Sequence, residues 1–250
     1  MIKDELRLVQ FALMFYTRIP VPSLAHVDQE TQDHASRYFP LVGWIVGCLN
    51  ALVFVLLASL FPHEISILLT MCFSILLTGA FHEDGMADAC DGLGGGWDKQ
   101  TILTIMKDSR VGTYGLVGLG AVLALKYTAL ANMPHDLVVA ALIAGHVISR
   151  WYSSLVMWLM DYVVADEVSK AKPITKGFEN KDFAIASITI APVLFVLPYD
   201  YYFACILASL PLFYFCRKLK RWLGGYTGDT LGAAQQLTEV AFYLAVVALL

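Results

Sequence analysis

Residues 41–61 have the sequence LVGWIVGCLNALVFVLLASLF, which contains no charged side chain. A helix needs roughly 20 apolar residues to cross a bilayer, so this segment is long enough to span one. After a short link, residues 65–81 continue with ISILLTMCFSILLTGAF, which is also uncharged. Because only helices and closed barrels span membranes, two such segments in succession predict a helical membrane protein.

The same character recurs along the rest of the chain. Further apolar segments lie at 114–133, 137–160, 183–198, 200–216 and 236–250. Hydrophobic residues make up 58% of the chain and charged residues only 15%, whereas soluble domains carry about 25% charged residues. We therefore predict an all-α, polytopic integral membrane helix bundle of about seven spans, or six. Residues 1–250 are expected to form one membrane-embedded domain.

The distribution of basic residues predicts the orientation. With seven spans and a cytoplasmic N-terminus, the outer loops contain no Lys or Arg, and the inner segments hold fifteen of the seventeen. This partition follows the positive-inside rule. Only Lys126 and Arg150 fall within predicted spans. Leu8–Tyr16 is apolar but too short to span, so we expect it in the interface or against the bundle.

An acidic motif, FHEDGMADACDGLGGGWD at residues 81–98, follows the second apolar segment directly. Asp84, Asp88 and Asp91 are spaced i, i+4, i+7, which places them on one face of a helix, with Glu83 nearby. Carboxylates crowded on one face repel one another, and a hard divalent cation removes that repulsion. The motif therefore favours Mg²⁺ with a phosphate-bearing substrate. The alternatives are a solvated acidic loop or a carboxylate cluster for ion or proton transport.

Glycines and cations beside this motif suit phosphate binding. Gly94 and Gly95, in the run that closes the motif, are expected to end the helix and expose backbone N–H groups. Gly85 lets another backbone or a ligand approach closely. Lys107 and Arg110 lie one helical turn apart and offer a point charge and a bidentate fork. Ordinary positive-inside anchoring is the alternative for this pair.

Four more charged residues complete the candidates for substrate binding. Asp229 lies in GGYTGDTLG, residues 224–232, a glycine-rich turn on the same predicted side as the acidic motif. Arg150 either faces a cavity in the bundle or snorkels to the cytoplasmic boundary. Arg18 and Arg37 precede the first span, where they either anchor the chain or fold over the cytoplasmic mouth. The net charge of −4 argues against nucleic-acid binding.

Taken together, these motifs resemble those of the cobalamin synthase family, the adenosylcobinamide-GDP ribazoletransferases. The motifs that carry the resemblance are TRIPVP at 17–22, RYFPLVG at 37–43, EDGMADACDGLGG at 83–95, MKDSRVGTYG at 106–115 and GGYTGDTLGA at 224–233. They occur in order and are distributed over most of the chain, from residue 17 to residue 233. The combination of the acidic motif with the Lys-Asp-Ser-Arg segment is highly specific.

The resemblance implies a reaction at the cytoplasmic face of a bacterial inner membrane. The 3′ hydroxyl of α-ribazole, or of its 5′-phosphate, displaces GMP from adenosylcobinamide-GDP and gives adenosylcobalamin or its 5′-phosphate. The family requires Mg²⁺, which we assign to Glu83, Asp84, Asp88 and Asp91. In this assignment Asp88 or Asp91 accepts the hydroxyl proton. Lys107 and Arg110 would hold phosphate oxygens, and Asp229 would complete the metal site or bind a ribose.

Two rival functions stay open at this point. The Asp-Gly pattern also resembles, more loosely, that of CDP-alcohol phosphotransferases, but their full motif carries an Arg and a different spacing. An ion-coupled transporter would hold its carboxylates near the bilayer midplane in broken helices. Here they follow a span and precede a cytoplasmic loop, which favours an enzyme. The sequence leaves the oligomeric state open, a homo-oligomer included.

Overall fold

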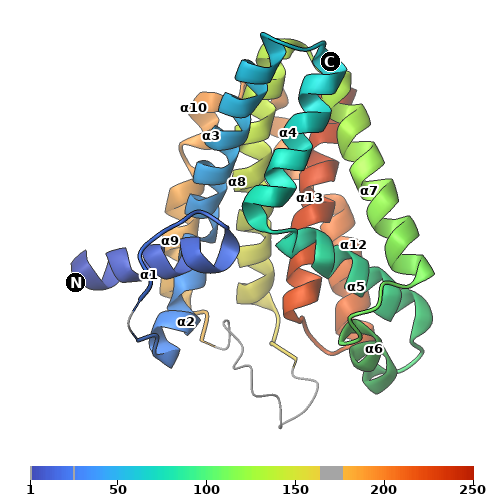
Figure 1. Cartoon of the computed structure of the whole chain (residues 1–250). Helices are drawn as coiled ribbons and strands as arrows, with labels where there is room; N and C mark the ends of the chain where they lie inside the picture. The colour runs from blue at the N-terminus through green and yellow to red at the C-terminus, as the bar shows by residue number, and fades with distance from the viewer. Residues whose placement is uncertain (1, 25, 164–176) are drawn as a thin grey trace.

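A computed structural model of the chain describes residues 2–24, 26–163 and 177–250, and every regular element in these ranges is helical (Figure 1). The predicted all-α bundle is thus confirmed. The long helices are α3 (Phe39–Ala58), α4 (His63–Thr78), α7 (Thr113–Ala131), α8 (His135–Leu159), α12 (Ser209–Trp222) and α13 (Gly228–Ala248). Within the described ranges, five helical stretches are long and apolar enough to cross a membrane, or six if α4 and the helix after it count as one bent span.

The predicted span 183–198 is not one continuous helix. The chain forms α9 (Asn180–Ile190) and the short α10 (Val193–Val196), which are separated by a turn at Ala191 and Pro192. Pro192 has no N–H to donate to the helix and so favours a break. Both pieces pack beside α8. In Figure 1, α9 lies at the level of α1 and α10 lies closer to the end of the bundle that carries the C-terminus.

Helix α1 (Ile2–Tyr16) runs across one end of the bundle and not along it (Figure 1). Ala12 and Tyr16 are buried against the core, whereas Leu6 is exposed. This agrees with the expectation that the segment is too short to span. The chain continues through α2 (Gln29–Ala35) and the 3₁₀ turn η1 (Ser36–Tyr38) into α3.

Two glycines bring α3 and α8 into direct backbone contact. A Cβ added at Gly43 would lie 2.5 Å from the His146 carbonyl oxygen, and one at Gly47 would lie 2.9 Å from the Ile143 Cα. The Gly-x-x-x-Gly spacing is typical of close helix packing in membranes. This contact fixes α8 in the centre of the bundle, where most of its side chains are buried.

The acidic motif forms a separate helix, α5 (Phe81–Gly95), which turns 89° away from α4. Gly79 (φ 66°) and Ala80 (φ 58°) both adopt the left-handed conformation that produces this bend. Because it crosses one end of the bundle (Figure 1), we place α5 outside the membrane-spanning helices. The short α6 (Lys99–Met106) follows it.

Helix α5 packs closely on the start of α13. A Cβ at Gly85 would lie 2.6 Å from the Asp229 carbonyl oxygen. The expectation that Gly85 admits a neighbouring backbone is therefore confirmed. The contact joins two motifs that are about 140 residues apart in the sequence and brings Asp229 beside the carboxylates of α5.

Candidate active site

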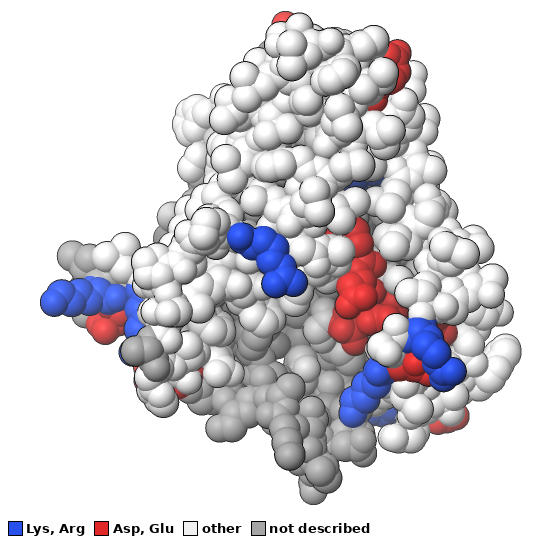
Figure 2. All heavy atoms as spheres, viewed as in Figure 1, with Lys and Arg blue, Asp and Glu red and all other residues white. Residues whose placement is uncertain are grey.

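We call the carboxylates of Asp84, Asp88 and Asp229 the acidic face. Asp84 is exposed, and the other two are half-buried at the junction of α5 and α13. Burial, and then the negative charges of Asp229 and Asp84, raise the pKa of Asp88 to about 7. Figure 2 shows carboxylates gathered on this side of the molecule, with Lys and Arg side chains beside them. These carboxylates repel one another, and no ion pair with a described residue compensates them, so a bound cation would stabilise their ionised forms.

Asp91, although on the same helical face, has a different environment. Its Oδ2 accepts a hydrogen bond from the Gly112 N–H at 2.7 Å, and its Oδ1 accepts one from the Gly115 N–H at 2.8 Å. These donors belong to the N-terminus of α7, where backbone N–H groups have no intrahelical partner. Both carboxylate oxygens of Asp91 therefore tie α5 to α7.

We expect Asp91→Ala to loosen the start of α7. Hydrogen bonds to a charged group contribute about 1.5–3 kcal/mol each, and the substitution removes two. Amide hydrogen exchange at Gly112 and Gly115 should become faster, while exchange in the centre of α8 should stay unchanged. Asp98→Ala, which removes another side chain that caps a helix, serves as the control. Unchanged exchange at Gly112 in Asp91→Ala would contradict this role.

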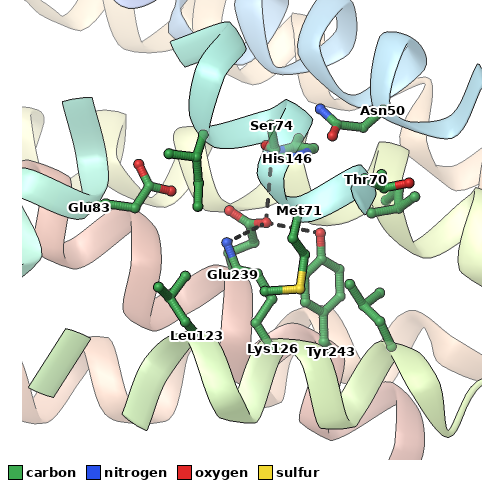
Figure 3. Close-up of a pocket in the computed structure, with 13 residues that line it drawn as sticks. Asn50, Thr70, Met71, Ser74, Glu83, Leu123, Lys126, His146, Glu239 and Tyr243 are labelled. Atoms are coloured by element: carbon green, nitrogen blue, oxygen red, sulfur yellow. Dashed lines mark hydrogen bonds and ion pairs between the residues drawn. The ribbon is translucent and has the colours of Figure 1, made fainter. Parts of the chain in front are cut away.

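Glu83 points away from the acidic face and into the bundle. We call the buried set that it joins the inner polar cluster, which comprises Glu83, Lys126, His146, Arg150, Gln235, Gln236, Glu239 and Tyr243. Figure 3 shows several of these side chains around a small cavity between α4, α7, α8 and α13. Gln236 donates to Glu83 Oε1 at 3.0 Å, while Glu83 Oε2 has no partner among the described residues.

Glu239 is the centre of the inner polar cluster. Its Oε1 lies 3.0 Å from the Lys126 ammonium and accepts a hydrogen bond from the Tyr243 hydroxyl at 3.0 Å. Gln235 donates to its other oxygen at 2.6 Å. Lys126, which the sequence left without a role, is therefore paired. Opposite charges in two predicted spans, at Lys126 and Glu239, were the signal that could have revealed this pair from the sequence.

The predicted phosphate-binding cations lie at the surface near α5. Arg110 is exposed and forms a bidentate ion pair with Asp108, with the shortest N···O distance at 2.6 Å. Hydrogen bonds from Arg110 lower the pKa of Asp108 to about 2. Lys107 is exposed as well. In this structure the Arg110 guanidinium is thus directed toward Asp108.

The glycine run ends the helix, as predicted, because α5 stops at Gly95 with Gly96 as its C-cap. The N–H groups of Gly94 and Gly95 are not exposed for a ligand, however, since both residues are still part of the helix. A Cβ at Gly94 would lie 2.6 Å from the ring of Tyr114. Gly94 therefore provides room for the first turn of α7.

The other three arginines that were predicted to bind substrate lie in three separate places. Arg18 packs over Gly79 at the bend between α4 and α5. Arg37 is buried and pairs with Asp182 at 3.0 Å and Glu5 at 2.6 Å, away from the acidic face. Arg150 is only 1% exposed, so it faces the bundle interior and does not snorkel.

The candidate metal ligands are carboxylate oxygens that do not yet form a complete coordination shell. In the described part of the chain, no three Asp, Glu, His or Cys side chains converge closely enough to hold a metal ion. Mg²⁺ is usually bound by one or two carboxylates together with substrate phosphates and water. The acidic face fits that mode, because Asp84 is exposed and its neighbours carry like charge.

Comparisons with known proteins identify the family. The model of the cobalamin-5-phosphate synthase family matches residues 8–247. This chain belongs to that family. An adenosylcobinamide-GDP ribazoletransferase of Shewanella frigidimarina is 44% identical, over 98% of this chain and 95% of its own length. An adenosylcobinamide-GDP ribazoletransferase of Leptospira interrogans is 41% identical, over 93% of this chain and 92% of its own length. No solved structure matches.

The family match favours the transferase over the phospholipid synthase and transporter interpretations. It confirms the resemblance that the five motifs carry. The residues that these motifs bring together around α5 are Asp84, Asp88 and Asp229, with Lys107 and Arg110 at its far end. The motif at 17–22 places Arg18 at the bend before α5, and the motif at 37–43 joins α1 to α9 through Arg37.

Proposed function

We propose that the acidic face is where this chain carries out ribazole transfer, the reaction for which its relatives are named. The observation that supports the proposal is the convergence of Asp84, Asp88 and Asp229 from two motifs distant in sequence. In the reaction, the 3′ hydroxyl of α-ribazole or its 5′-phosphate attacks the phosphorus next to the cobinamide. The bond from that phosphorus to GMP breaks, and the hydroxyl proton goes to a base.

Each carboxylate is assigned a separate role. Asp84 and Asp229 would hold Mg²⁺, which neutralises charge on the pyrophosphate when it is bound. Asp88, whose pKa both of these carboxylates raise, accepts the hydroxyl proton. Asp91 is the weaker choice for that base, because both of its oxygens already accept backbone hydrogen bonds. The proposal moves Glu83 from the metal site to the support of α5.

The two surface cations would bind the substrate phosphates. Lys107 and Arg110 follow α6, next to the helix that carries the acidic face. If a substrate phosphate displaced the Asp108 carboxylate, that phosphate would offer Arg110 an equivalent bidentate partner. Electrostatic stabilisation and alignment are the main requirements of phosphoryl transfer.

The proposal also includes an orientation. The chain is a membrane protein by its apolar helices, and α5 lies toward the end of the bundle that carries the N-terminus (Figure 1). The basic residues favour the cytoplasm for that end. The acidic face would then open to the cytoplasm at the inner membrane of a bacterium.

An assay with purified protein in liposomes tests the function. Adenosylcobinamide-GDP and α-ribazole 5′-phosphate are supplied with Mg²⁺ or with EDTA, and GMP and the joined corrinoid are quantified. We expect equal amounts of both products with Mg²⁺ and neither with EDTA. Full activity in EDTA would refute the metal assignment, and no product from folded protein under either condition would refute the reaction.

A further inference from the structure

The side of α5 opposite the acidic face lines an apolar groove. Met86, Cys90 and Leu93 lie about half a turn around the helix from Asp84 and Asp88. They form the floor together with α13, and helices α7 and α12 form the two walls. The four helices meet on the right side of the bundle in Figure 1. We call this feature the α7–α12 groove.

The α7–α12 groove opens between two helical stretches, Thr113–Ala131 and Tyr199–Trp222, that are long and apolar enough to span a membrane. Val117 on α7 is 64% exposed and Tyr214 on α12 is 72% exposed, and both line it. Their outward-facing neighbours are also apolar. The groove encloses about 450 Å³, within the range of about 300–1,000 Å³ found for ligand pockets. It therefore has the size and surface for a flexible apolar chain.

A single cation lies at one end of the groove. Pro211, Phe215 and Lys218 are spaced i, i+4, i+7 on α12 and all line it, so they form one stripe. Lys218 is half-buried near the end of the helix, and it makes no ion pair or hydrogen bond with any residue that the structure describes. An apolar channel with an unpaired ammonium at its polar end has the charge pattern of a phospholipid site.

We propose that the α7–α12 groove binds one anionic phospholipid, with an acyl chain along Leu93 and Phe215 and the headgroup phosphate on Lys218. The basic residues Arg217, Lys220 and Arg221, which flank Lys218 on the last turns of α12, keep the local potential positive. The lipid would pack against the side of α5 opposite the acidic face and so stabilise the position of this helix.

Photo-cross-linking in nanodiscs tests the proposal. The full chain is placed in phosphatidylcholine with a trace of phosphatidylglycerol that carries a diazirine on one acyl chain, and cross-linked peptides are located by mass spectrometry. We expect labels on residues 86–94 and 211–218. Lys218→Gln should reduce them about fivefold, as expected for one basic residue at an anionic surface. Lys181→Gln, an exposed change on α9 away from the groove lining, should not reduce them.

A second pair of variants tests the groove itself. Val117→Trp should fill it and abolish the labels, whereas Leu116→Trp, one residue away and outside the lining, should leave them. Labelling of α3, which does not line the groove, gives the background in each sample, and an unchanged unfolding midpoint in mixed micelles shows that each variant is folded. Equal labelling in Lys218→Gln and the parent chain, labels spread evenly over all helices, or cross-links between two copies of the chain through the groove would each overturn the proposal.

Discussion

Asp88→Asn is expected to lower kcat/KM by about 10²–10⁴-fold, the usual contribution of a positioned general base. Asparagine keeps the size of the side chain but cannot accept the proton of the attacking hydroxyl. The loss should appear in kcat and persist at saturating Mg²⁺. The measurement is GMP release from adenosylcobinamide-GDP by enzyme in liposomes.

Asp84→Asn separates proton transfer from metal binding. Because Asp84 is assigned to Mg²⁺ and not to the proton, its loss should raise the Mg²⁺ concentration needed for half-maximal activity. Asp98→Asn is the matched control, since Asp98 is exposed outside the acidic face and asparagine caps helices equally well. If Asp88→Asn and Asp98→Asn had equal activity, the acidic face would not be the catalytic site.

The membrane fold could be predicted because its physical signal is local. Uncharged segments of about 20 residues reveal spanning helices wherever they occur, and segments 41–61 and 114–133 correspond closely to α3 and α7. Segment 183–198 has the right composition, but Pro192 interrupts it. Hydropathy averages over a window and does not register the loss of one N–H donor.

The acidic site could be predicted only in part. Helical spacing correctly placed Asp84 and Asp88 on one face, yet it could not distinguish them from Asp91. That difference depends on the N–H groups of Gly112 and Gly115, which bind Asp91. Both groups lie at the N-terminus of α7, more than twenty residues away in the sequence. Glu83 differs for a similar reason, because its partner Gln236 comes from the last helix.

Glu239→Gln is expected to produce the largest loss of stability. Glu239 is 2% exposed and compensates the buried ammonium of Lys126 at 3.0 Å. Removing one member of a buried ion pair typically costs about 3–5 kcal/mol, because the other charge stays buried without compensation. Unfolding of the purified protein in mixed micelles should therefore shift to a lower denaturant concentration. Glu64→Gln, an exposed change near the start of α4, should leave the midpoint unchanged.

The double variant Glu239→Gln with Lys126→Met distinguishes lost charge compensation from lost packing. Methionine keeps much of the lysine stem but carries no charge, so the penalty of the single variant should largely disappear. Gln236, which now links Lys126 to Glu83, would retain only its contact with α5. Recovery of stability without recovery of kcat would show that the inner polar cluster positions α5 for the reaction. Failure to recover stability would show that Glu239 acts mainly through its hydrogen bonds to Gln235 and Tyr243.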